Sequence, residues 1–349
     1  MDRDRLVEAI SHGEIIQRED LSDLDLRGAD LSGAVFEQVK LAGDQLRGAD
    51  LTETTLLGCE LIGCSLEGTK LRHTDLIRCD GRNASFAGAD LTLTTFAETD
   101  LTGASFAQSE LPLTTFVKCD LTRVSFAGSK LDRTRLLEVD TTELNLTGAD
   151  LKQVTFYQAD FRQAVFEGAR LHQTVLVQSR FGDRDLRGLS LAFCQLTDCD
   201  LRGASLREAT IHNAGFQGAD LRDADLTKAQ ARNCVFQGAQ LAGAKLIQGD
   251  FHQAIFIEAD LSGADATGAN LVQSNLLRAR CRATRFVDAE LTYADFSHAD
   301  ITEADFSGAS LRRARFHRTS EQGAVFTDRA AALGDDEKLA QAERFQPAH

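Results

Sequence analysis

The residues of this 349-residue chain with the most versatile chemistry are its eight cysteines, because thiolates bind metals and form disulfides. Their spacing argues against both uses. Seven of them fall at one phase of a five-residue period, two positions before a large apolar residue; they are Cys59, Cys64, Cys79, Cys119, Cys194, Cys199 and Cys234. Elsewhere this position holds mostly Ala, Ser, Thr or Val, and Cys281 replaces a large apolar residue. We therefore predict buried, reduced thiols that pack as small apolar groups.

The eight histidines give no metal-binding pattern either. His172, His212 and His252 share one phase but are 40 residues apart, and we expect the histidines not to cluster. The serines and threonines lack a positioned base, and the glycines recur at a fixed period rather than in a phosphate-binding loop. We predict no catalytic residue, no cofactor-binding residue, no metal site and no cofactor, so the chain is not expected to be an enzyme.

The elements that would position these residues follow a strict five-residue period. Large apolar residues recur from Leu21 to Phe326 in 62 consecutive units without insertion or deletion, and 56 of these centres are Leu, Phe or Ile. Neither a helix nor a simple strand has this period. Each unit must be a short extended piece and a turn, with the centre and the small residue two before it pointing inward. Most glycines stand two positions after a centre, which predicts a turn residue with positive φ.

The units ADLTG, ADLRD, ADLSG and ANLVQ resemble the A(D/N)LXX motif of the pentapeptide repeat family. This resemblance implies an all-β fold, a right-handed quadrilateral β-helix with four units per coil. Residues 20 apart would then stack, and 62 units divided by four give about 15 coils. We expect residues 1–20 to form an N-terminal helical cap and residues 21–326 the β-helix. Residues 327–349 would form a C-terminal helical cap or a dimerisation segment, since related proteins that inhibit gyrase dimerise through their C-terminal ends.

The two ends carry helical patterns. Leu6, Val7 and Ile10 have helical spacing, and Gly13 stands where a helix would end. Residues 328–333 predict one or two helical turns. Asp335 or Asp336 can cap a further helix with Leu339, Ala342 and Phe345 along one side.

Three positions break the inward pattern. Arg184 and Leu189 occupy positions that otherwise hold small residues, and Asp44 is a similar intrusion. Burying an unpaired charge costs several kcal/mol. We therefore expect local backbone distortions that turn these side chains outward.

The predicted stacking aligns a set of acids just before the centres of one face: Glu60, Asp80, Asp100, Asp120, Asp140 and Asp160. Neighbours would lie about 5 Å apart. Two interpretations stay open for this acidic column. The aspartates could make local turn hydrogen bonds, or the column could bind a partner by mimicking the phosphates of duplex DNA.

A second candidate surface is a basic patch near the C-terminus: Arg278, Arg280, Arg282, Arg285, Arg312, Arg313, Arg315 and Arg318. It is either a solvated face or a docking site for an acidic partner.

Composition and pattern together favour a protein-binding role. The net charge of −15 argues against direct nucleic-acid binding. The leading hypothesis is a non-enzymatic protein–protein interaction scaffold or adaptor that presents flat β-helix faces. The family resemblance leaves open a role as an accessory or effector protein of a bacterial secretion system, with a component of that apparatus as the partner.

The alternative is an acidic mimic of duplex DNA that binds and inhibits or protects a type II topoisomerase such as gyrase. It is weakened by the length of the array, the lack of a projecting loop and the nearly neutral second half of the chain. The sequence shows no secretory signal and no apolar run long enough for a membrane span. We expect a cytoplasmic protein, with export by a signal-independent system left open, and a homodimer through the C-terminal end as one assembly.

Overall fold

Backbone hydrogen bonds link each turn of the chain to residues about 20 positions further on. The N–H of Leu31 donates to the carbonyl of Asp50 at 2.8 Å, and the N–H of Phe216 donates to the carbonyl of Val235 at 2.7 Å. Parallel bridges join residues 20 apart at position after position, as between Asp30 and Asp50. The computed structural model is therefore a β-solenoid with a 20-residue coil, of about 16 turns, and the predicted fold class is confirmed. It describes residues 2–41, 43 and 45–344.

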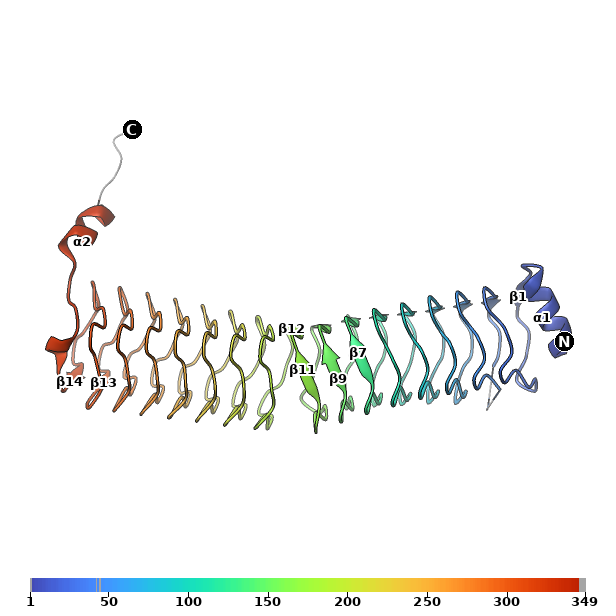
Figure 1. Cartoon of the computed structure of the whole chain (residues 1–349), viewed down its shortest axis with the longest axis horizontal. Helices are drawn as coiled ribbons and strands as arrows, with labels where there is room; N and C mark the ends of the chain where they lie inside the picture. The colour runs from blue at the N-terminus through green and yellow to red at the C-terminus, as the bar shows by residue number, and fades with distance from the viewer. Residues whose placement is uncertain (1, 42, 44, 345–349) are drawn as a thin grey trace, which may run out of the picture. The chain divides into compact units, whose positions relative to one another are not determined.

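The chain divides into two compact units, Met1–Arg180 and Phe181–His349. Figure 1 shows the stacked coils of each unit. In unit 1, helix α1 (Arg3–Ser11) lies beside the first strand and buries Leu6 and Ala9. This is the helix that the sequence predicts near the N-terminus. The side chain of Asp2 caps it by accepting the N–H of Arg5 at 2.9 Å.

Unit 1 contains a nine-stranded parallel sheet that runs along one face of its coils, in the order β1-β2-β3-β4-β5-β6-β8-β10-β12. Its strands are β1 (Ile15–Gln17), β2 (Val35–Glu37), β3 (Thr55–Leu57), β4 (Asp75–Ile77), β5 (Thr95–Ala97), β6 (Thr115–Val117), β8 (Arg135–Leu137), β10 (Thr155–Tyr157) and β12 (Val175–Val177). A second sheet has the order β11-β9-β7 and consists of β7 (Lys130–Asp132), β9 (Asp150–Lys152) and β11 (Arg170–His172). Because β1 pairs in register with β2, the coils begin within the segment 1–20.

Unit 2 repeats the coil with isolated bridges and one two-stranded sheet, β13 (Asp305–Phe306) paired with β14 (Val325–Phe326). A 3-10 helix, η1 (Arg329–Ala331), and helix α2 (Glu337–Arg344) follow. The carboxylate of Asp336 accepts the N–H groups of Lys338 and Leu339 and so caps α2, as the sequence predicts. Phe345, assigned to the same predicted helix, lies outside the described residues.

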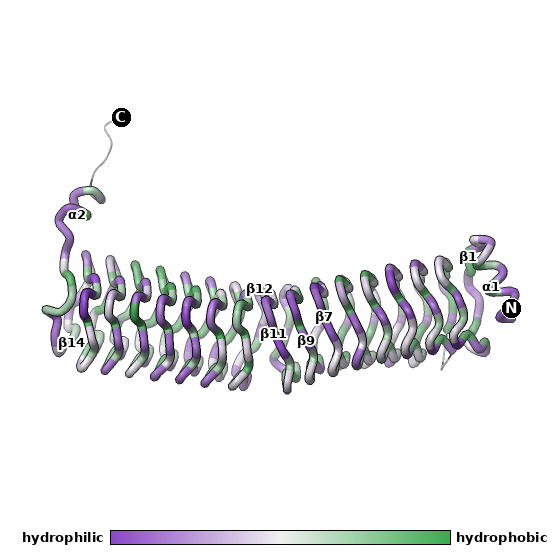
Figure 2. Tube along the Cα trace, in the orientation of Figure 1, coloured by the Kyte–Doolittle hydropathy of each residue, from purple (hydrophilic) through white to green (hydrophobic). Residues whose placement is uncertain are grey.

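The core of both units consists of the predicted inward positions, and Figure 2 shows apolar and polar residues alternating along the coils. Phenylalanines 20 apart stack face to face: the ring centroids of Phe86 and Phe106 are 4.7 Å apart, and those of Phe96 and Phe116 are 4.8 Å apart. Threonines at the small inward position are satisfied by backbone, as where Thr54 Oγ1 donates to the carbonyl of Leu31 at 3.0 Å. Side chains therefore fill the coil interior, as predicted.

The turn prediction is also confirmed, and it extends beyond glycine. Gly148 has φ +64°, but Leu93 (φ 62°) and Arg123 (φ 58°) adopt the same left-handed conformation at the same phase. Such residues carry a steric cost of roughly 1–2 kcal/mol each, so the coil itself imposes the turn.

The predicted distortion is present at the start of unit 2. The positive φ lies at Gly182 instead of the usual position 183. The N–H of Arg184 donates to the carbonyl of Gly182 at 2.8 Å, where other units bond back to the centre. Arg184 and Leu189 are both half-buried. The distortion is confined to the coil at Arg184, because the N–H of Leu189 makes the regular bond to the carbonyl of Leu186 at 3.1 Å, so the distortion expected at Leu189 is absent. Asp44 lies outside the described residues.

Candidate interaction surfaces

The eight cysteines are all buried and free of disulfides, which confirms the packing prediction. Burial raises the pKa of Cys119 to about 11 and that of Cys234 to about 12. The thiol form therefore persists at neutral pH, and these sulfurs are poor nucleophiles.

The acidic column lies in unit 1, and the coils bring its members into line. Bridges connect Glu60 to Asp80, Asp80 to Asp100, Asp100 to Asp120 and Asp120 to Asp140. Asp160 is bridged to Arg180, and its own N–H donates to Oγ1 of Thr141 at 2.9 Å. Five of the six predicted residues thus form one continuous row of bridged neighbours, with Asp160 next to a cation.

Cations neutralise the two ends of this column. Arg82 contacts Asp80 at 2.6 Å and approaches Asp100 at 3.8 Å, and its hydrogen bonds hold the pKa of Asp80 below its usual value. Lys40 lies 3.5 Å from Glu60. Hydrogen bonds from Arg162 are the main reason that the pKa of Asp160 is lowered, and Arg180 lies 3.2 Å from the same carboxylate.

Asp120 and Asp140 are the exception in the middle of the column. Among the described residues of unit 1, no ion pair shorter than 4 Å involves Asp120 or Asp140. The N–H of Thr122 donates to Asp120 and the N–H of Thr142 donates to Asp140, both at 2.9 Å. These are the local turn hydrogen bonds that one interpretation predicts, and they leave the charge of both carboxylates exposed to solvent.

The eight arginines of the predicted basic patch do not form one patch. Arg278 and Arg318 share a phase but are two coils apart, and the 312–315 group lies at a different part of the coil. Most are neutralised by acids on a neighbouring coil, through the ion pairs Arg278–Glu258, Arg280–Asp260, Arg282–Asp300, Arg285–Asp265 and Arg315–Asp295. Arg318 pairs with Glu343 at 2.7 Å, and Arg313 lies over the ring of Tyr293 at 5.9 Å. Arg312 makes no ion pair among the described residues.

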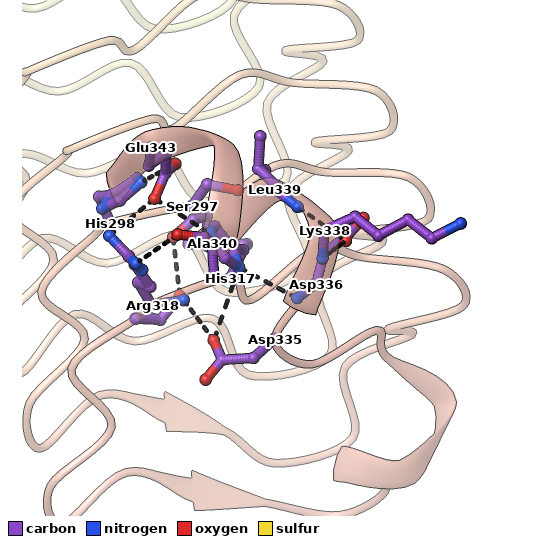
Figure 3. Close-up of polar contacts among 12 residues, drawn as sticks. Ser297, His298, His317, Arg318, Asp335, Asp336, Lys338, Leu339, Ala340 and Glu343 are labelled. Atoms are coloured by element: carbon purple, nitrogen blue, oxygen red, sulfur yellow. Dashed lines mark hydrogen bonds and ion pairs between the residues drawn. The ribbon is translucent and has the colours of Figure 1, made fainter. Parts of the chain in front are cut away.

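Two histidines cluster, so the prediction that the histidines do not cluster is wrong. The ring centroids of His298 and His317 are 5.5 Å apart, and Glu343 of α2 reaches both rings. Figure 3 shows this network between α2 and the coil beneath it. Nε2 of His298 lies 3.0 Å from Glu343, and Nε2 of the fully buried His317 lies 3.5 Å from it.

These three side chains have types and spacing that could hold a metal ion, but the hydrogen bonds fit another role. The N–H of Asp336 donates to Nδ1 of His317 at 3.1 Å. A neutral His317 must therefore carry its proton on Nε2, where a metal would need a lone pair. The cluster fits docking of α2 better than metal binding.

Sequence reasoning missed this cluster because Glu343 comes from outside the repeat. The 20-residue spacing could have revealed the two histidines of this cluster. Position 318 lies one coil beyond His298, and His317 comes directly before position 318.

Comparison with known proteins agrees with this architecture. A profile described as a pentapeptide repeat region matches residues 29–106, and one described as pentapeptide repeats (8 copies) matches segments between residues 99 and 328. The second profile alone matches more than half of the chain, so the chain belongs to the pentapeptide repeat family. Proteins of this family are generally non-enzymatic structural or interaction proteins. Among curated proteins, none matches this chain.

Solved structures of the same family are similar to it. HetL, a pentapeptide repeat protein involved in heterocyst differentiation regulation in the cyanobacterium Nostoc, is 27% identical, with 73% of this chain and 89% of HetL covered and a TM-score of 0.26. QnrB1, a plasmid-mediated fluoroquinolone resistance protein, is 17% identical over 63% of this chain and 96% of its own, with a TM-score of 0.32. A pentapeptide repeat protein of the Arabidopsis thaliana thylakoid lumen is 30% identical over 34% of this chain and 69% of its own, with a TM-score of 0.17. No helix among the described residues is long and apolar enough to span a membrane.

Proposed function

We propose that this chain is a non-enzymatic scaffold that binds another protein through the outer surface of its coils. The observation that carries this proposal is the register of the outward side chains. Residues 20 apart are bridged one to one, so that equivalent side chains form straight columns over a filled core. A long regular surface without a lumen is suited to contact with a macromolecule.

Within that surface, the acidic column is the region we assign to the partner. Two adjacent members of the column, Asp120 and Asp140, carry carboxylates that no cation neutralises among the described residues. Like charges at this spacing repel weakly in water, and a partner's arginine or lysine would relieve the repulsion. The partner expected here is a protein with a basic surface.

The alternative, mimicry of duplex DNA, is supported by the same row of acids. Arg82 and Arg162 oppose it, because they lie within the column and cancel its charge where a DNA strand would stay negative. The test is a gyrase supercoiling assay with added protein. Lack of inhibition at micromolar concentrations would remove this alternative.

The scaffold proposal is tested by affinity capture from native cells with the full chain as bait. We expect a protein to be recovered by the wild type and lost with the double substitution Asp120→Asn and Asp140→Asn. The matched control is Asp30→Asn with Asp90→Asn, because these aspartates accept equivalent turn hydrogen bonds from Ser32 and Thr92.

Equal recovery with both double variants would contradict the assignment to the acidic column. Mass spectrometry of the captured protein then decides the class of partner. Secretion-apparatus components would support an accessory or effector role, and topoisomerase subunits would support the alternative.

A further inference from the structure

The outer face of the nine-stranded sheet in unit 1 is apolar along one row. The third residue of each strand points outward, and seven successive strands, β3 to β12, place an apolar or aromatic side chain there: Leu57, Ile77, Ala97, Val117, Leu137, Tyr157 and Val177. Six of these side chains are half-buried, and Tyr157 is 37% exposed. Contiguous apolar surface of this length marks an interaction site on a soluble protein.

Charged residues flank this row on both sides. On one side, the residues that follow β4, β5, β6 and β8 form the series Arg78, Glu98, Lys118 and Glu138. On the other side, the first residues of β4 and β8 are Asp75 and Arg135, with the threonines of β5 and β6 between them. None of these six charges takes part in the ion pairs found within the described part of unit 1.

The two charged rows are self-complementary about one axis. Consider a twofold axis that runs along the strand direction, midway between β5 and β6. It places each row of one copy against the same row of the second copy, with the order of the strands reversed. It places Glu98 opposite Lys118 of a second copy, and Arg78 opposite Glu138 of that copy. The same axis also pairs the charges of the other row, because it places Asp75 opposite Arg135 of the second copy.

Six of the seven apolar residues obey the same axis, while Val177 of β12 falls opposite Glu37 of β2. Ala97 then faces Val117, Ile77 faces Leu137, and Leu57 faces Tyr157. Outside the strands, Leu93 and Leu113, exposed by 39% and 36%, occupy equivalent turns next to β5 and β6 and would also face each other.

Other positions of the axis lose this agreement. With the axis on β5, Glu98 would face Glu98 of the second copy, and Arg78 would face Lys118. With the axis on β6, Lys118 would face itself and Glu98 would face Glu138. Moving the axis by a full strand leaves one ion pair in the first row and no Asp75–Arg135 pair.

We propose that two copies of this chain associate antiparallel through the outer face of this sheet. With the axis between β5 and β6, eight strands of each copy overlap. At ~4.8 Å spacing and about five extended residues across, they give roughly 630 Å² per copy, toward the low end for specific interfaces. Interfaces of this size are typical of transient complexes, and we expect a dissociation constant on the order of 10 µM. This inference does not rest on the proposed function, because the acidic column is a different surface.

The test is sedimentation velocity of the full chain at concentrations from below to well above that value. We expect a monomer–dimer equilibrium in the wild type. Lys118→Glu places two like-charge contacts in the interface and should weaken association by about tenfold. The double substitution Glu98→Lys with Lys118→Glu should restore association to within about threefold of the wild type.

The double substitution also separates this proposal from a purely intramolecular role of the charges. Within one chain it replaces the alternating series by two adjacent cations, at positions 78 and 98, and two adjacent anions, at positions 118 and 138. If the alternation serves only the stacking of coils, the double variant should be less stable to heat than either single variant and should not regain association.

Leu339→Glu in α2 is the control for assembly through the C-terminal end, since Leu339 is an exposed apolar residue of that helix. It should leave association unchanged. The proposal is overturned by a wild type that stays monomeric at about 200 µM, roughly twentyfold above the expected constant. A dimer that tolerates Lys118→Glu, or that is lost with Leu339→Glu, would overturn it as well.

Discussion

The strain in each turn depends on whether the residue two positions after the centre is glycine. The turn residue two positions after the centre has positive φ whether or not it is glycine, as at Gly148 and Arg123. Glycine adopts this conformation freely, while a residue with a Cβ is strained by contact with the backbone. The many non-glycine turns are sustained by the hydrogen bonds and packing of neighbouring coils.

This turn predicts opposite effects of two substitutions. Gly148→Ala adds a Cβ at φ +64° without a close clash, since the nearest atom is 4.0 Å away, and should lower the free energy of unfolding by about 1 kcal/mol. Arg123→Gly removes the same strain at φ 58° and should raise it by up to about 1 kcal/mol. Urea denaturation followed by circular dichroism measures both changes. Equal destabilisation by the two substitutions would show that the turn conformation is not what limits stability.

At the scale of the element, side-chain polar contacts hold helix α2 against the coils of unit 2. Glu343 connects it to His298, His317 and Arg318, and the N–H of Arg318 donates to the carboxylate of Asp335 at 2.7 Å. We infer that the segment after the repeats covers the last coils of unit 2. There, the N–H of Phe316 donates to the carbonyl of Leu333 at 2.9 Å.

Glu343→Gln should therefore release α2 without unfolding the coils. We expect faster proteolysis between residues 334 and 344 and an unchanged unfolding transition of the array. The matched control is Glu337→Gln in the first turn of α2. Protection that survives Glu343→Gln would contradict the assigned role.

The docking of α2 should also depend on pH. The pKa of Glu343 is lowered, mainly by its hydrogen bond with His298. A carboxylate with a lowered folded-state pKa contributes fully above its unfolded value of 4.5 and loses that contribution as the pH falls through the folded value. Hydrogen exchange of α2 should therefore rise below about pH 4.5 in the wild type, and this rise should be absent in Glu343→Gln.

At the scale of the whole molecule, the described residues of each unit form a stack in which a coil is bridged to the coils one turn before and after it. Stability is then close to a sum of coil and interface terms. Phe116 is fully buried and stacks on Phe96, so its loss acts on the adjacent coils of unit 1.

Phe116→Ala should cost about 3–5 kcal/mol locally. Hydrogen exchange should show reduced protection in the coils around β5 and β6, with no change in unit 2. Val165→Ala, at a side chain that is 42% exposed, is the control and should have little effect. An equal loss of protection in both units would show that the chain unfolds as one cooperative body.

Much of the fold could be predicted because inward positions are constrained by volume. A centre must be large and the position two before it small, so Leu31, Phe116 and Cys119 reveal their burial through residue type alone. The acidic column followed from the same period, since a 20-residue coil places Asp100 beside Asp120. The basic patch failed as a single surface because nearness in sequence does not keep residues on one face of such a coil.

The sequence by itself determined the five-residue unit, its filled interior, the turns with positive φ and the buried cysteines, because each depends on residue size and local backbone geometry at a fixed phase. The 20-residue coil was implied by the resemblance to the pentapeptide repeat family. Only the tertiary structure decided that Arg82 lies between two aspartates, that β1 continues the sheet beyond Leu21, and that Glu343 joins His298 to His317. Outward side chains and segments outside the repeat are not constrained by core volume. Their partners are fixed by flexible side-chain geometry and long-range contacts, which the five-residue period does not record.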